Sequence, residues 1–386
     1  MMRGFPPAGS PVGLPAIGPC AILGVAGDER VAGFDAALAG AGLPPARLLD
    51  YADFAAEPAR LAALFPEGYG LLRIDSPGSA PRIRRALARL AGAEPEADED
   101  ATRLHPDHAV QGGLAAALDL ARRLLPPWVA ATHEAGTVAL FYDKRACHAA
   151  MRAAGVPVPR ALAPAGGVAA LIEAMRAAGL SRVFVKPRFG SGAAGIAAVT
   201  VGPGGIEAVS AAERGAGGTL HHSRRLRRVR GMEAVALLDA ILARDAHVEQ
   251  WVPKAAVQGR PCDLRVLVVA GEVAHTVLRL GAGPITNLDL GGCRAEADLL
   301  RARVAPAAWA AMLDDCRLFA GLFPNTFQVA LDVAFTASLR RHVVFEANAF
   351  GDLIRRVRHQ GLDPYAWQVA RLPAWLAARR SPGLAA

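Results

Sequence analysis

A lysine followed by a glycine-rich segment is the first group of residues that can do chemistry. Lys186 ends an apolar, strand-like run at 182–186. Four small residues follow it closely: Gly190, Ser191, Gly192 and Gly195. Because glycine lets the backbone approach a ligand, the N–H groups of such a loop can surround phosphate oxygens. The segment is neither a Walker A loop nor a dinucleotide-binding fingerprint, since the lysine precedes the glycines. A glycine-rich hairpin with a surface lysine is the alternative.

Two carboxylates and an amide form the second group. Asp332 lies in the apolar run FQVALDVAF, and Glu346 and Asn348 lie in the next such run, RHVVFEANAF. Side chains on a strand repeat with period two, so Glu346 and Asn348 face the same way. A few protein oxygens, completed by water and phosphate oxygens, suit Mg²⁺. Polar strand residues that face solvent are the alternative.

The choice of basic residues is a third signal. The chain has 386 residues and a net charge of +8, and only three of its 43 basic residues are lysines: Lys144, Lys186 and Lys254. Where arginine fills most positions that need only a positive charge, the remaining lysines indicate sites that require a compact, flexible ammonium. The net charge alone would suggest a nucleic-acid or membrane-surface partner. The general arginine excess explains it more simply.

The densest basic segment, 221–231, contains five arginines: Arg224, Arg225, Arg227, Arg228 and Arg230. It has three interpretations. It can be a solvated strand or loop, it can flank the active-site cleft and attract an anionic substrate, or it can bind nucleic acid. Nucleic acid is disfavoured because no aromatic residues are interleaved for base stacking.

Taken together, these motifs resemble those of the ATP-grasp superfamily, in particular the carboxylate–amine ligases that include ribosomal-protein glutamate ligases and glutathione-synthetase-like enzymes. The resemblance covers about residues 130–360. The motifs occur in the family's order: DK at 143–144, GVPVP at 155–159, KPRFGSGAAG at 186–195, EQWV at 249–252, DLRVLVV at 263–269, a following arginine, ITNL and GG within 285–292, and the D and ExN of the carboxylate group.

The resemblance implies roles for individual residues. Lys144 and Lys186 are similar to the two nucleotide-phosphate lysines, and Asp263 resembles the acidic residue near the ribose. Four residues resemble the hinge that holds the adenine: Glu249, Gln250, Trp251 and Val252. Three resemble the residues lining the γ-phosphate and acyl-phosphate side: Arg265, Arg279 and Asn287. The implied metal ligands are Asp332, Glu346 and Asn348. Lys254 has no counterpart, and it is expected either in an exposed loop or at the nucleotide.

The function implied by the resemblance is an ATP- and Mg²⁺-dependent ligase that joins a carboxylate to an amine through an acyl phosphate. Two magnesium ions are expected, with Mn²⁺ as an alternative, and the carboxylate can belong to a small molecule or a peptide. A kinase of the same fold, or a nucleotide-binding protein without catalysis, is the second hypothesis. Binding of a polyanion or nucleic acid by the arginine segment is the third. The turn after Asn348 departs from the family, because 349–352 reads AFGD in place of a Pro-Gly turn.

The elements that must position these residues follow from the alternation of apolar runs and amphipathic segments. From Cys20 onward this rhythm predicts an α/β domain with a mainly parallel sheet over 20–127, after a loose leader at 1–19. An α+β ATP-grasp domain is expected over 128–386, with a smaller lobe at 144–250, a larger lobe at 251–370 and ATP between them. Within it, Ala270-Gly271-Glu272 is predicted to turn an antiparallel hairpin.

Cysteine usage and hydropathy indicate the compartment. The five cysteines show no metal-ligand spacing, and the prolines in 4–27 interrupt the one long uncharged stretch. A cytoplasmic protein without a membrane segment is therefore expected. A homodimer is left open.

Overall fold

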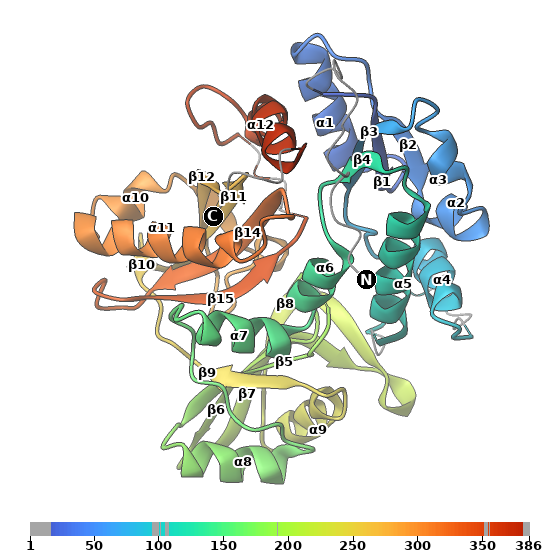
Figure 1. Cartoon of the computed structure of the whole chain (residues 1–386). Coiled ribbons are helices and arrows are strands. Elements are labelled where there is room, and N and C mark those ends of the chain that lie inside the picture. The colour runs from blue at the N-terminus through green and yellow to red at the C-terminus, as the bar shows by residue number, and fades with distance from the viewer. Residues whose placement is uncertain are drawn as a thin grey trace.

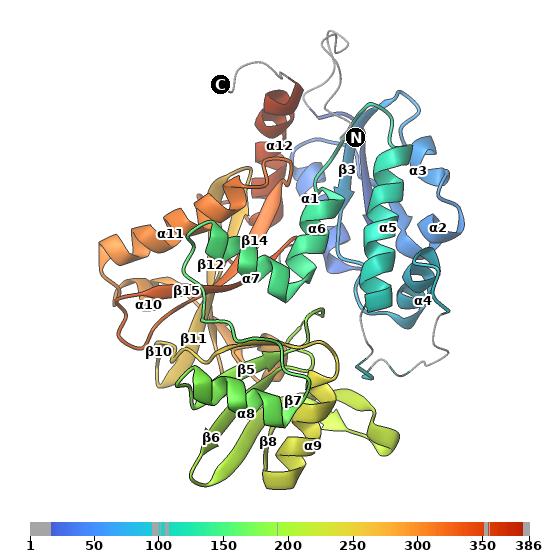
Figure 2. The same ribbon diagram turned by 60° about the horizontal axis from the view of Figure 1, so that its bottom comes forward.

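A computed structural model describes residues 17–94, 100, 102–104, 108–190, 192–350, 354 and 356–380. Three sheets organise this part of the chain (Figures 1 and 2). Each sheet belongs to a separate unit, and the units follow one another along the sequence except at the C-terminal helix.

The first unit is a parallel sheet of four strands in the order β2-β1-β3-β4, as the alternating sequence rhythm predicts. Its strands are β1 (Cys20–Gly24), β2 (Arg47–Asp50), β3 (Tyr69–Ile74) and β4 (Trp128–Ala131). Its helices are α1 (Glu29–Gly40), α2 (Tyr51–Ala56), α3 (Arg60–Ala63), α4 (Pro81–Leu90) and α5 (His108–Leu124). The last strand, β4, begins just after the expected boundary at residue 127 and pairs with β3. Two helices, α6 (Ala135–Tyr142) and α7 (Lys144–Ala153), then lead out of this unit.

The second unit is an antiparallel sheet in the order β8-β7-β6-β5-β9. Its strands are β5 (Arg182–Lys186), β6 (Ala197–Gly202), β7 (Gly205–Arg214), β8 (Leu220–Arg230) and β9 (His247–Gln250). The helices α8 (Val168–Ala177) and α9 (Gly231–Leu242) cover one face and bury alternate strand residues such as Val183 and Val185. Phe184 and Lys186, which alternate with these two valines along β5, therefore face the opposite way.

The third unit is an antiparallel sheet in the order β13-β12-β11-β14-β15, with β10 paired to β11. Its strands are β10 (Ala256–Val257), β11 (Arg260–Val269), β12 (Glu272–Leu280), β13 (Cys293–Ala295), β14 (Gln328–Phe335) and β15 (His342–Asn348). The predicted hairpin is confirmed. Ala270 and Gly271 both have positive φ, 50° and 80°, which is typical of a two-residue turn that matches the strand twist.

Alternation along β11 explains how the third unit packs against helices on both of its faces. Leu264, Val266 and Val268 belong to the core on which α11 (Pro306–Gly321) packs, with the short α10 (Asp298–Arg301) before it. On the other face, Leu267 and Val269 pack under the last helix, α12 (Pro364–Arg380), which also contacts α1 of the first unit. Figure 1 shows α12, in red, beside both units.

Candidate active site

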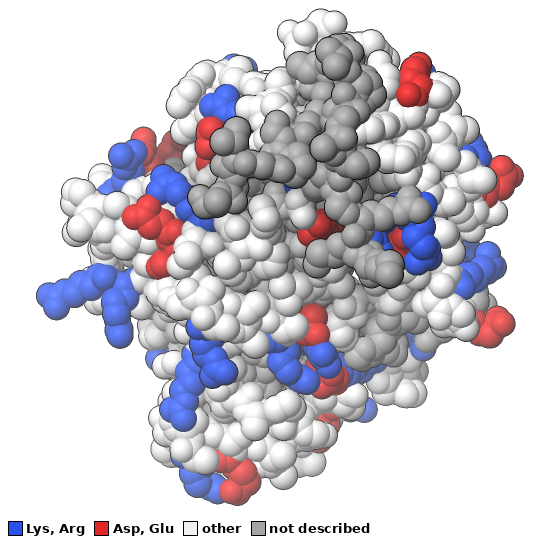
Figure 3. Space-filling model, in the orientation of Figure 1, with Lys and Arg blue, Asp and Glu red and all other residues white. Residues whose placement is uncertain are grey.

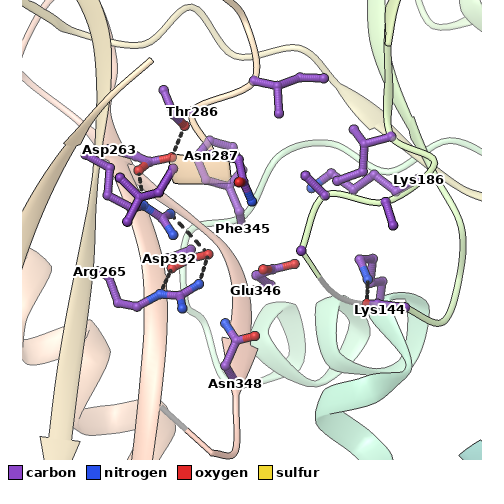
Figure 4. A pocket seen from close by; sticks show the side chains of 18 of the residues that line it. Lys144, Lys186, Asp263, Arg265, Thr286, Asn287, Asp332, Phe345, Glu346 and Asn348 are labelled. Atoms are coloured by element: carbon purple, nitrogen blue, oxygen red, sulfur yellow. Dashed lines mark hydrogen bonds and ion pairs between the residues drawn. The ribbon is translucent and has the colours of Figure 1, made fainter. Parts of the chain in front are cut away.

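A pocket of about 580 Å³ lies where the three units meet. Figure 4 shows that its labelled side chains converge from opposite walls, with Lys144 and Lys186 on one side and Asp263, Arg265 and Asp332 on the other. All three lysines of the chain line this pocket. This placement agrees with the expectation that the rare lysines mark positions needing an ammonium.

The glycine loop and Lys144 form one wall. Lys144 begins α7, and its Nζ donates to the carbonyl oxygen of Gly190 at 2.6 Å. Gly190 and Gly192 have φ angles of 121° and 67°, which residues other than glycine rarely adopt. Ser191 lies outside the described residues. Gly195 does not line the pocket; a Cβ there would lie 2.7 Å from Cγ of Pro187, so its role in the structure is to let the loop close on β5.

Lys186 projects into the same pocket as half of a buried ion pair. Its Nζ lies 2.5 Å from Oε1 of Glu249 on β9, and the two residues are 7% and 1% exposed. Burial raises the pKa of Glu249, but Lys186 and His247 lower it more, so that it falls to about 2. Burial likewise lowers the pKa of Lys186, and the carboxylates of Glu249 and Glu346 outweigh this and raise it. Both groups are therefore charged at neutral pH.

A chain of alternating charges crosses the third sheet opposite Lys186. Asp332 accepts from Nε and Nη2 of Arg265 at 2.7 and 2.8 Å, and Nη2 of Arg279 lies 3.1 Å away. Nε of Arg279 donates to Asp263 at 2.7 Å. Although burial opposes ionisation, Arg265 and Arg279 hold the pKa of Asp332 well below its usual range. The two arginines are thus fixed in orientation as they face the pocket.

The predicted metal ligands lie together as expected. Asp332 is directly opposite Glu346, and Asn348 is two residues along β15. The two carboxylates are close enough to interact, an arrangement that a cation between them stabilises. The buried amide nitrogen of Asn348 has no hydrogen-bond partner among the described residues, and rotation of the amide would present its oxygen instead. This donor set of two carboxylates and one amide fits Mg²⁺, which keeps further positions for water and phosphate oxygens.

A β-bulge brings one more side chain into the pocket. Asp332 pairs with Glu346 and Val333 with Val344, so Phe345 has no partner on β14. The extra residue turns both Phe345 and Glu346 toward the pocket, which both of them line. Nothing in the sequence pattern indicates this bulge, and the importance of Phe345 is not predicted.

The segment after Asn348 is tied to the first unit. Nε2 of His133, which follows β4, donates to the carbonyl oxygen of Ala349 at 2.7 Å, and its ring packs against Phe350. Burial lowers the pKa of His133 to about 4, so the ring is neutral at pH 7. The rest of the unusual turn, 351–352, lies outside the described residues.

The expected adenine hinge is only partly at the pocket. Glu249 lines it, whereas Gln250, Trp251 and Val252 do not. The Trp251 ring packs against Phe184 at 5.4 Å between centroids. Asn287 lines the pocket, but its Oδ1 accepts from the backbone N–H of Asp289 and caps a short 3₁₀ turn. Its amide N–H groups are the part left to face a ligand.

Several pocket residues besides Phe345 have no role assigned from the sequence. Lys254 lies at the pocket with its side chain 10% exposed, and not in an exposed loop, and it contacts Asp263 and Thr286. Its rarity was the only sequence signal. The first unit also contributes Arg30, in the first turn of α1, and Ser76, just after β3, both of which follow the carboxyl ends of strands in its sheet. Open parallel sheets bind ligands at this edge, but the sequence does not show that the edge would meet the ATP-grasp motifs.

The arginine segment forms β8, an edge strand of the second sheet. Arg228 and Arg230 pair with Glu207, and Arg227 pairs with Glu233. On the face shown in Figure 3, basic and acidic side chains are interspersed. The role of this segment stays a prediction. Within the described residues, no helix is long and apolar enough to cross a membrane.

No protein-family model and no curated protein matches this sequence. Solved structures do resemble it. D-cycloserine synthetase DcsG is 16% identical over 94% of this chain and all of its own, with a TM-score of 0.55. The ATP-grasp ligase PsnB, complexed with minimal precursor, Mg and ADP, is 15% identical over 94% of this chain and 97% of its own (TM-score 0.51). Biotin carboxylase from Campylobacter jejuni is 12% identical over 95% of this chain and 72% of its own, with a TM-score of 0.51. The chain therefore has the ATP-grasp fold, with the α/β and α+β units predicted from its motifs.

Proposed function

We propose that this protein is an ATP- and Mg²⁺-dependent ligase that joins a carboxylate to an amine. The convergence of all three lysines, the glycine loop, two fixed arginines and a two-carboxylate, one-amide cluster on a single pocket carries this proposal. The fold supports it, because D-cycloserine synthetase DcsG and the Mg- and ADP-bound ligase PsnB share it.

In the first step, an oxygen of the substrate carboxylate attacks the γ-phosphorus of ATP. A new P–O bond forms, the bond to the β,γ-bridging oxygen breaks, and ADP leaves with that electron pair. Phosphoryl transfer depends on positioning and charge neutralisation, so lysines and arginines suffice without a nucleophilic side chain. Lys144 and the backbone of Gly190 and Gly192 are placed to hold phosphate oxygens, and Arg265 and Arg279 to neutralise the transferred group.

The metal contributes charge neutralisation across the phosphates when it is bound. Asp332, Glu346 and Asn348 are the residues that would hold it, with two ions expected and Mn²⁺ as a substitute. Because Asp332 is already oriented by Arg265 and Arg279, its carboxylate requires little rearrangement on binding.

In the second step, the amine nitrogen attacks the acyl carbon of the acyl phosphate. A C–N bond forms, the C–O bond to phosphate breaks, and the nitrogen loses a proton as phosphate departs. The N–H groups of Asn287 and the guanidinium of Arg279 are placed to stabilise the oxygen that becomes negative during the attack. A small-molecule or peptide carboxylate is the proposed substrate.

The first test measures binding of Mg²⁺–ADP by calorimetry to the wild type, Lys186→Met and Glu346→Gln. Arg301→Met, on the exposed face of α10, is the matched control. We expect the first two variants to lose at least tenfold in affinity, and Lys186→Met most, while the control binds normally. Unchanged affinity in both pocket variants would refute the assignment of the site.

The second test screens carboxylates and amines for release of ADP and phosphate. With an ¹⁸O-labelled carboxylate, an acyl phosphate transfers one labelled oxygen to the released phosphate. A kinase would instead leave the phosphate on its product. Label in phosphate, together with an amide detected by mass spectrometry, is the expected result.

A further inference from the structure

Lys254 lies at the pocket, although the family resemblance assigns it no role. It is one of three lysines in a chain with 43 basic residues, and the other two serve the proposed phosphate site. It lies two residues beyond the expected hinge, and its backbone pairs with Thr336 just after β14. Its side chain is 10% exposed and reaches the same pocket. A largely enclosed lysine side chain in an arginine-rich chain indicates a position where a guanidinium does not fit.

The Lys254 ammonium has a donor to spare. Its Nζ donates to Oδ2 of Asp263 at 3.0 Å and to Oγ1 of Thr286. An ammonium carries three N–H groups, and no acceptor for the third is found among the described residues. These two contacts fix the nitrogen beside the pocket, 4.9 Å from the centroid of the Phe345 ring.

Asp263, which resembles a ribose-binding acid, is in turn held by three hydrogen bonds. Its Oδ1 accepts from Arg279, and its Oδ2 accepts from both Lys254 and Thr286. Two of these three hydrogen bonds come from charged groups, so Asp263 holds both Lys254 and Arg279 in a defined orientation. The geometry therefore makes Asp263 the counter-ion of Lys254.

The order of residues along β15 places the sugar of a bound nucleotide next to Lys254. Asn348 and Glu346, with Lys144 across the pocket, mark the phosphate end. The ring of Phe345 has the ammonium of Lys254 at 4.9 Å and that of Lys186 at 5.5 Å, and Lys186 is paired with Glu249 of the expected hinge. A nucleotide that extends from the phosphate end to the hinge must pass Phe345, where these two ammonium groups approach.

We propose that Lys254 donates a hydrogen bond to a sugar hydroxyl of the nucleotide, and that Asp263 and Thr286 position it for this purpose. The inference rests on the proposed ATP-binding function and assigns a contact within it. Hydroxyl oxygens are acceptors as well as donors, so a lysine can recognise a ribose as an acid can.

The experiment compares Mg²⁺–ADP with its 2′-deoxy and 3′-deoxy analogues by calorimetry. The wild type is expected to bind ADP about tenfold more tightly than at least one analogue, which is the effect of a hydrogen bond to a charged group. Lys254→Met is expected to bind all three with similar affinity. Arg317→Met, an exposed cation on α11, is the control and should keep the wild-type preference.

The outcomes separate this inference from the proposed function. If the wild type does not bind Mg²⁺–ADP, the proposed function itself fails. If it binds ADP and both analogues equally, or if Lys254→Met keeps the preference, only the role of Lys254 is refuted. The wild-type comparison needs no variant to fold, and Lys254→Gln, with a shorter neutral donor, provides a second substitution that should reduce the preference.

Discussion

At the scale of single residues, the pocket is built from buried charges that compensate one another. Lys186 is held by Glu249, and Lys254, Asp263, Arg279, Asp332 and Arg265 form one alternating chain. Removing one member of such a pair leaves its partner charge buried without a counter-ion, which costs more than the pair contributes. Substitution of a residue in one of these pairs is therefore expected to lower the free energy of unfolding as well as ligand affinity.

Glu249→Gln tests this at the Lys186 pair. The variant leaves the Lys186 ammonium without its counter-ion, and the free energy of unfolding at pH 7 should fall by about 3 kcal/mol. The pKa of Glu249 is lowered in the folded state to about 2 from 4.5, so its stabilisation is present above pH 4.5 and is lost as the pH falls toward 2. Urea unfolding at pH 7, 5, 4 and 3 should show the two proteins converging.

The control for this measurement is Glu173→Gln, an exposed residue on α8. It should change stability by less than about 0.5 kcal/mol at every pH. A gap between Glu249→Gln and the wild type that stays constant down to pH 3 would contradict the ion pair as the cause.

The sequence predicts a site residue well when a local pattern positions it, and poorly when tertiary contacts do. Glu346 and Asn348 could be placed together because strand periodicity fixes their common face. Phe345 could not, because a bulge is a local irregularity of two paired strands. Thr286 and Lys254 meet Asp263 only after the chain has folded back on itself, and no local pattern encodes that contact.

At the scale of elements, the long periodic segments were predictable and the short ones were not. The hairpin predicted at 270–272 joins β11 and β12, and the runs around Asp332 and Glu346 are β14 and β15. The four-residue β4 was left out of the first sheet, since so short a strand is defined by its partner β3 and not by its own sequence. The patterns also do not predict α12, which contains Pro373 and depends on the surfaces it covers.

The contact between α4 and α5 allows a matched test on adjacent residues. A Cβ on Gly113 would lie 1.8 Å from the carbonyl oxygen of Leu87, so Gly113→Ala must push two helix backbones apart. We expect it to lower the free energy of unfolding by at least about 2 kcal/mol. A Cβ on Gly112 would have its nearest neighbour at 3.7 Å, an ordinary van der Waals contact. Gly112→Ala should therefore raise the free energy of unfolding by up to about 1 kcal/mol through helix propensity.

Chemical denaturation of both variants gives the measurement. Equal effects at the two positions would mean that helix propensity, and not the close approach of α4 and α5, controls this pair of glycines.

At the scale of the whole molecule, three sheets meet at one pocket, and α12 packs against both the first and the third unit. Arg73 on β3 binds Asp75 through Nε and donates to Gln368 of α12 at 2.6 Å. Its guanidinium also lies over the rings of Phe34 and Tyr365. This one buried side chain therefore connects the first sheet, α1 and α12.

Arg73→Met should uncouple these elements. Asp75 would be left buried and unpaired, so we expect a loss of about 3 kcal/mol in stability. Hydrogen exchange should become faster in α12 as well as in β3, because both depend on the same guanidinium. Arg89→Met, at an exposed position on α4, is the control. Unchanged exchange in α12 would show that apolar packing alone holds the helix in place.

The position of α12 also affects how the protein is made. Ile22, Phe34 and Leu71 share a core with Trp367, Leu372 and Leu376 of α12. At ribosomal rates of 5–20 residues per second, roughly 15 to 60 s pass between synthesis of the first group and synthesis of the second. During that interval this apolar surface on the nascent chain lacks its final cover. We therefore expect the newly synthesised N-terminal sheet to be a chaperone substrate until α12 has left the ribosome.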